Sequence, residues 1–330
     1  MKKYKGFLTV YGHGNVLNAL QTAMKHDKIS HAYIFEGNKG VGKSTVASGF
    51  AKMLTCTSED QPPCGVCKAC LMSAAGSHPD ILTVRLGEEK SIKVEEIRTI
   101  TKEVYLKPYG AKRKVVIIPD ADKMTEQSQN ALLKTLEEPP SYAVLILVTQ
   151  NASALLSTIL SRAVVVRFAD LSERIIAHYL EDHFDTLTPA HRQLIATICG
   201  GSIGRAKELA QTLDGDDFRH EATAQLAAFY QNQVGSHADF AIYLKKQSDF
   251  IDSLLTFYTV LFRDMLYYKE GLKDKVINTD LLEKISSICE QLAGRSIIKA
   301  VEGLLVAQKR LAMHTSFEIT VENLLLALNI

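Results

Sequence analysis

Eight consecutive residues of this chain, GNKGVGKS, match the GxxxxGK[ST] pattern of a phosphate-binding loop. The glycines let the backbone curl so that successive N–H groups point at phosphate oxygens. The lysine can reach the outer phosphates of a nucleotide, and the hydroxyl that follows can hold a magnesium ion. An apolar strand pattern precedes the loop and a helical pattern follows it, as this motif requires. The predicted nucleotide-binding residues are Gly37, Gly40, Gly42, Lys43, Ser44 and Thr45.

Four of the six cysteines are clustered in one short segment. Two overlapping two-residue spacings put three thiolates on a tight knuckle, and the preceding loop can return the fourth. Four sulfurs that leave no open coordination position suit a structural, tetrahedral zinc site. A thiol redox centre is the alternative, and the missing thioredoxin-like context argues against it. The predicted zinc ligands are Cys56, Cys64, Cys67 and Cys70.

An acidic segment follows the apolar run 115–118. In an active ATPase, the first acid after such a strand directs magnesium and the next polarises the attacking water. Here Pro119 interrupts the strand end, and the acids are Asp120 and Asp122. Two interpretations remain open. Asp120 is an altered catalytic acid, or both aspartates begin a loop and cap the helix that starts near Thr125.

Arg162 lies just before another apolar run. A fixed guanidinium can stabilise charge on a transferring phosphate, including one that is bound by a neighbouring chain. From the residues alone, a surface arginine in a salt bridge is the simpler interpretation.

The scaffold that positions these residues is predicted to be an α/β fold in the first half of the chain. Short apolar runs alternate with helical patterns, which indicates a parallel sheet covered by helices on both faces. From about residue 170 the strand patterns stop, and a turn signal at 214–216 separates two helical parts. The predicted strands are 32–35, 81–84, 115–118, 143–149 and 164–168. The predicted domains are 1–169, with the cysteine module 56–70 inserted, then 170–214 and 215–330.

The composition excludes several classes of protein. Apolar residues make up 46% and charged residues 23% of the chain, as in soluble globular proteins. No apolar run approaches the roughly 20 residues of a membrane helix, and no secretory signal is recognised, so a cytoplasmic protein is expected. The 38 basic and 37 acidic residues give a net charge of +1, which argues against a chain that coats DNA by its own electrostatics.

Several of these segments together resemble the clamp loader of bacterial DNA polymerase III, a family of AAA+ proteins. The resemblance covers residues 1–210 well, whereas 216–330 match only in being helical and of suitable length. The string ALLKTLEEPP within 131–140 is specific to this family. The other matching segments are His31-Ala32-Tyr33, the loop 37–45, the four cysteines and Ile159-Leu160-Ser161-Arg162.

The resemblance implies a RecA-like parallel sheet, a small helical lid and an all-α C-terminal collar that serves oligomerisation. It also favours the delta-prime class of subunits over the ATP-hydrolysing tau/gamma motors. Pro119 and Asp120 stand where the motors carry their magnesium-directing aspartate and catalytic glutamate, and Gly204 stands where they carry an arginine, with Arg205 displaced by one residue. Such a chain would be a largely non-hydrolysing ring member, with Arg162 as an arginine finger acting in trans.

The partners that the resemblance implies are tau/gamma motor subunits, a delta subunit, the sliding clamp indirectly, and primer–template DNA within the complex, with no membrane. The implied cofactors are structural zinc and, because the loop is intact, ATP with magnesium. Two alternatives stay open. One is an autonomous ATPase with Asp120 as base and Arg205 as sensor, and the other is a zinc-dependent DNA-binding module.

Overall fold

The computed structural model describes residues 7, 9–58, 62–84, 91–212, 216–231, 236–248, 251–313 and 315–328. The chain divides into two compact units, residues 1–175 with 201–204, and residues 176–200 with 205–330. The predicted boundary between the two helical domains falls at residues 214 and 215, which lie outside the described residues. The division of the helical part into 170–214 and 215–330 therefore stays a prediction.

The first unit contains a five-stranded parallel sheet in the order β2-β3-β4-β1-β5. The strands are β1 Ala32–Glu36, β2 Ile81–Thr83, β3 Lys114–Ile118, β4 Ala143–Thr149 and β5 Val164–Arg167. All five predicted strands are confirmed, and each strand end lies within one residue of its predicted position. Central β4 is buried along its whole length. Strand β5 is at the edge of the sheet, and its Val164 is 47% exposed.

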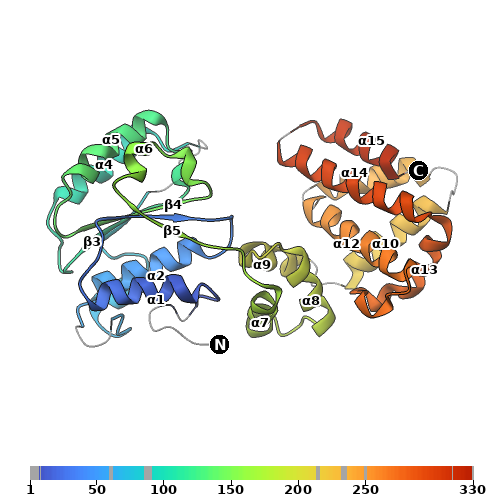
Figure 1. Ribbon diagram of the computed structural model, residues 1–330, viewed down its shortest axis with the longest axis horizontal. Helices are drawn as coiled ribbons and strands as arrows, with labels where there is room; N and C mark the ends of the chain where they lie inside the picture. The colour runs from blue at the N-terminus through green and yellow to red at the C-terminus, as the bar shows by residue number, and fades with distance from the viewer. Residues whose placement is uncertain are drawn as a thin grey trace. The chain divides into compact units, whose positions relative to one another are not determined.

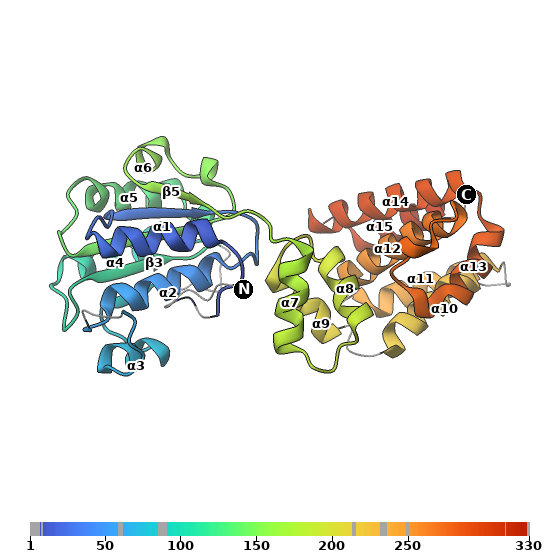
Figure 2. The same ribbon diagram turned by 60° about the horizontal axis from the view of Figure 1, so that its bottom comes forward.

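Helices cover the two faces of the sheet (Figure 1). On one face lie α1 Gly14–Lys25 and α2 Lys43–Thr55, and on the other lie α4 Val94–Tyr105, α5 Glu126–Glu137 and the short α6 Ser157–Leu160. Alternate residues of β1 enter opposite cores, so that Tyr33 and Phe35 pack on one side and Ile34 on the other. Beyond α2, the short α3 Lys68–Ala74 projects from the sheet (Figure 2).

The described part of the second unit is helical. Thr188 caps α8 by accepting the N–H of His191, and Pro189 occupies the first turn, where a missing N–H costs little. No helix among the described residues is long and apolar enough to cross a membrane. The helices after β5 are α7 Glu173–His183, α8 Pro189–Ile198, α9 Ile203–Thr212, α10 Asp216–Tyr230, α11 Ser236–Lys246, α12 Ile251–Lys269, α13 Leu282–Gln291, α14 Gly294–Ala312 and α15 Phe317–Leu328.

Asp80, only 1% exposed, ties together the segments that lead into β2 and β3. Its carboxylate accepts the backbone N–H groups of Tyr109, Gly110 and Ala111 at 2.7, 3.1 and 3.1 Å. Burial acts to raise the pKa of Asp80, but these three hydrogen bonds together outweigh it, so that the pKa is lowered. The ionised carboxylate therefore stabilises the fold.

We expect Asp80→Asn to lower the free energy of unfolding by about 2–3 kcal/mol at neutral pH, because an amide replaces an ionised acceptor of three buried donors. Since the folded pKa is lowered, this stabilisation is complete above the unfolded-state pKa of about 3.9 and is lost as the pH falls through the folded pKa. Urea unfolding at pH 7 and pH 3 measures the difference, with exposed Asp185→Asn as control. A difference that is as large at pH 3 as at pH 7 would contradict this role.

Candidate functional site

The phosphate loop joins the end of β1 to the start of α2, as predicted. Gly40 and Gly42 have φ of 77° and 104°, a left-handed conformation that side chains with a Cβ rarely adopt. Ser44 and Thr45 are exposed in the first turn of the helix. Both line a hollow of about 390 Å³ that also touches Val10 and Lys52. Of the predicted nucleotide-binding residues, only Ser44 and Thr45 line this hollow.

Lys43 is 7% exposed, and its ammonium donates to the carbonyl oxygens of Gly37 at 2.6 Å and Asn38 at 2.7 Å. Burial lowers the pKa of Lys43, and the charges of Asp122 and Asp120 oppose that shift. The negative charges of these two carboxylates therefore favour the protonated form of Lys43.

The loop is held in place by residues from distant parts of the first unit. His13 Nε2 lies 2.8 Å from the carbonyl oxygen of Val41, and the Asn38 amide donates to both carboxylate oxygens of Asp170 at 2.8 and 3.0 Å. The Ser202 hydroxyl donates to the carbonyl oxygen of Lys39 at 2.9 Å. In a trans peptide the N–H points opposite to its carbonyl. Each carbonyl that is held in this way therefore turns the N–H group of its own peptide away from its partner.

Gly204 also contacts the loop, through its backbone. Its N–H donates to the carbonyl oxygen of Gly40 at 2.9 Å. A Cβ on Gly204 would lie 2.9 Å from the Cα of Gly40, so this position has no room for a side chain. Arg205, the next residue, donates instead to Asp252 at 3.0 Å and Thr256 at 2.6 Å in the second unit. The structure thus gives the guanidinium of Arg205 partners outside the loop.

The two aspartates after β3 have different surroundings. Asp120 has φ 48° and pairs with Lys123 at 3.2 Å. Asp122 accepts the Thr149 hydroxyl at 2.9 Å and the Gln150 N–H at 3.2 Å, which ties the ends of β3 and β4 together. The aspartates do begin a loop, but neither caps α5.

Thr125 is the N-cap of α5 and accepts the N–H of Ser128 through its own side chain. The hydrogen bond between Asp122 and Thr149 was not predicted from the sequence, which pointed to Asp120 instead. It could have been expected, because polar residues at the carboxyl ends of neighbouring parallel strands meet at one edge of the sheet.

Arg162 follows α6 and forms the salt bridge that the simpler interpretation expected, with Glu137 at 3.0 Å. Parallel pairing aligns Tyr33 of β1 with Val164 of β5. Arg162 therefore lies near the level where β1 begins, whereas the phosphate loop starts where β1 ends. At about 3.3 Å per residue, the two are roughly 20 Å apart along the strands. The side chain does not reach the chain's own loop.

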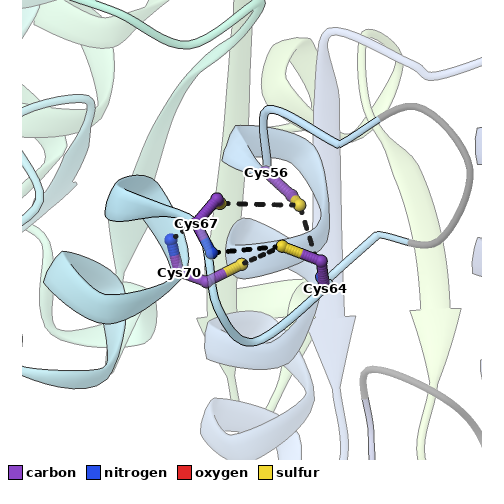
Figure 3. A group of neighbouring side chains, drawn as sticks. All are labelled: Cys56, Cys64, Cys67 and Cys70. Atoms are coloured by element: carbon purple, nitrogen blue, oxygen red, sulfur yellow. Dashed lines mark hydrogen bonds between the residues drawn. The ribbon is translucent and has the colours of Figure 1, made fainter.

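The four cysteines come together between α2 and α3 (Figure 3). All four sulfurs lie within 4.8 Å of one another, and the closest pairs, Cys56–Cys67 and Cys64–Cys70, are 4.0 Å apart. A tetrahedral ion with metal–sulfur bonds of about 2.3 Å requires sulfur separations of about 3.8 Å. Backbone N–H groups of Cys64, Cys67 and Cys70 donate to cluster sulfurs at 3.3–3.4 Å. The cluster therefore fits a metal ion.

The thiols differ in acidity. Hydrogen bonds from the side chain and backbone of Thr57 lower the pKa of Cys67 to about 5, whereas burial raises the pKa of Cys70 to about 12. A bound dication would favour the thiolate form of each of its ligands.

Comparisons with known proteins identify the family. A family model described as DNA polymerase III, delta subunit, matches residues 12–172. The chain is 31% identical over 320 residues to the DNA polymerase III subunit delta-prime of Bacillus subtilis, covering 95% of each protein. The chain belongs to the DNA polymerase III delta-prime family. The predicted resemblance is thus confirmed, and the parallel sheet with helices on both faces agrees with the predicted fold class.

Tau and gamma subunits of DNA polymerase III are also similar to this delta-prime family member. It is 36% identical over 237 residues to DNA polymerase III subunit tau of Escherichia coli, covering 69% of this chain and 36% of tau. Among solved structures, a DNA polymerase III gamma subunit-related protein from Thermotoga maritima matches with a TM-score of 0.48 and 20% identity, covering 94% of this chain and 98% of that one.

The contact between Gly204 and Gly40 gives a testable property of this delta-prime family member. We expect Gly204→Ala to lower the free energy of unfolding by about 1–3 kcal/mol, because the added methyl group meets the loop backbone. The matched control is Gly294→Ala, where an added Cβ meets nothing within 4 Å. Urea unfolding compares the two. Equal effects of the two substitutions would show that the contact does not hold the loop.

Proposed function

We propose that this chain is the delta-prime subunit of a clamp loader, a largely non-hydrolysing member of a ring. It supplies Arg162 in trans to the ATP of the neighbouring motor subunit while the sliding clamp is loaded onto primed DNA. The observation that carries the proposal is the register of β5 on β1, which leaves Arg162 out of reach of the chain's own phosphate loop. An arginine there serves phosphate chemistry only for a nucleotide held by another chain.

The environment of the acidic segment supports weak or absent hydrolysis. Asp120 pairs with Lys123, Asp122 binds the end of β4, and Arg205 pairs with Asp252. These contacts favour the delta-prime function over the alternative of an autonomous or tau/gamma-like ATPase, in which Asp120 would be the base and Arg205 the sensor. The alternative requires steady-state ATP turnover by the isolated chain.

The proposed partners are tau/gamma motor subunits and a delta subunit, with the clamp reached through them and primer–template DNA bound by the assembled complex. In this proposal residues 170–214 form the lid and residues 215–330 the collar that holds the hetero-oligomeric ring together in the cytoplasm. The net charge of +1 supports DNA contacts that are shared among subunits.

Arg162→Ala tests the function. In a mixture of motor subunits, delta subunit, clamp and primed DNA, we expect this substitution to lower ATP turnover at the site it serves by about tenfold or more, since the guanidinium no longer stabilises transition-state charge. Size-exclusion chromatography must show that the complex still assembles. If the isolated wild-type chain hydrolyses ATP and Arg162→Ala leaves ATP turnover by the mixture unchanged, the proposal is wrong and the chain is an autonomous ATPase.

The intact loop predicts ATP binding without turnover. We expect the isolated chain to bind ATP with magnesium in the micromolar range, and Lys43→Ala to weaken binding by about tenfold or more through the loss of the phosphate-binding cation. Exposed Lys28→Ala is the control for a lost positive charge. Titration calorimetry measures both variants, and equal affinities for wild type and Lys43→Ala would rule out the loop as the binding site.

We further propose that the cysteine cluster holds zinc in a structural role, since four sulfurs fill its coordination sphere. Elemental analysis is expected to find about one zinc per chain. Cys67→Ser should lose the metal and lower the melting temperature by about 5 °C or more, whereas Lys68→Ala should do neither. Strongly salt-dependent DNA binding by the isolated chain that disappears on chelation would instead favour a zinc-dependent DNA-binding module.

A further inference from the structure

The guanidinium of Arg162 is held at both of its terminal nitrogens. One donates to the carbonyl oxygen of Thr158 at 3.0 Å and to the Ser161 hydroxyl at 3.2 Å. The other forms the salt bridge with Glu137 Oε1 at 3.0 Å. The first two partners belong to the same turn as the arginine. Glu137 is the partner that comes from another element, because it is the last residue of α5.

The same helix also holds the chain that leads to Arg162. Gln129 of α5 is 5% exposed. Its amide oxygen accepts the N–H of Leu156 at 2.8 Å, and its amide nitrogen lies 3.3 Å from the carbonyl oxygen of Ala154. One helix therefore fixes the backbone before α6 through Gln129 and the side chain after α6 through Glu137.

The salt bridge is exposed enough to be exchanged for another anion. The side chain of Glu137 is 52% exposed and that of Arg162 is 35% exposed. Ion pairs at such positions are weak. A triphosphate offers several charged oxygens to the planar guanidinium of Arg162, so the triphosphate competes well with the single carboxylate of Glu137. The carboxylate can thus orient the arginine without retaining it.

We propose that Glu137 is a positioning residue for Arg162. The Glu137 carboxylate holds the guanidinium of Arg162 in one orientation at the end of α5. Phosphate oxygens of the neighbouring subunit's nucleotide then replace this carboxylate. This inference rests on the proposed function of Arg162. Its physical basis is that an arginine oriented beforehand loses less side-chain freedom when it binds the phosphate.

Two properties separate positioning from general structural support. A positioning residue acts only through Arg162, so its removal has no further effect once Arg162 is gone. It changes the turnover rate of the assembled complex and leaves the concentration of this chain needed for assembly unchanged.

The experiment is a double-mutant cycle in the full clamp-loading mixture of motor subunits, delta subunit, clamp and primed DNA. We expect Glu137→Ala to lower the maximal rate of ATP turnover by about two- to fivefold, the range for an exposed ion pair. Glu137→Gln keeps an acceptor oxygen and should retain more of the rate. Exposed Glu138→Ala is the matched control and should match wild type. The double variant Glu137→Ala/Arg162→Ala should equal Arg162→Ala.

The outcomes distinguish the two proposals. If Arg162→Ala lowers the rate and Glu137→Ala does not, the positioning role is wrong and the trans-acting function stands. If Arg162→Ala has no effect, the proposed function fails, and the role of Glu137 fails with it. A double variant slower than Arg162→Ala, or a higher concentration of this chain needed for half-maximal turnover, would make Glu137 a structural residue and overturn the inference.

Discussion

The parallel pairing of β1 with both β4 and β5 is the constraint on which the chemistry of this chain depends. It sets the phosphate loop at the carboxyl end of the sheet, beside the ends of β3 and β4, where Asp122 and Thr149 meet. The same pairing puts the start of β5, and with it Arg162, near the opposite end. The sheet therefore separates Arg162 from the phosphate loop by more than a side chain can span. In the proposed function, the loop that this arginine serves belongs to a neighbouring chain.

At the loop end, the structure combines an intact phosphate-binding sequence with unusual neighbours. The backbone of Gly204 lies so close to the backbone of Gly40 that a side chain at position 204 would not fit. Pro119 follows β3, and Asp120 after it has a left-handed conformation. In the proposed function the loop binds phosphate without turnover, which is possible because binding and the activation of water use different residues.

The sheet, its helices and the cysteine cluster could be predicted from the sequence, because each depends on spacing within a short segment. Alternating burial along β1 follows from the two-residue period of a strand, and the cysteine knuckle follows from two overlapping short spacings. The contacts that hold the loop could not be predicted in this way. Asn38 and Asp170 are 132 residues apart, and Ser202 and Lys39 are 163 apart, so no local pattern links them. The exposure of Val164 depends on strand order, which the apolar run does not encode.

Helix α5 does more than cover the sheet with apolar residues. Leu132 and Leu136 of α5 are buried against the sheet, as any covering helix would require. Gln129 and Glu137 have no such requirement, yet one holds the backbone before α6 and the other holds the guanidinium after it. Because both polar residues lie on one rigid helix, the position of Arg162 is coupled to the same element whose N-terminus follows the acidic segment. A single helix thus links the acidic segment that precedes its N-terminus to the arginine bound at its C-terminus.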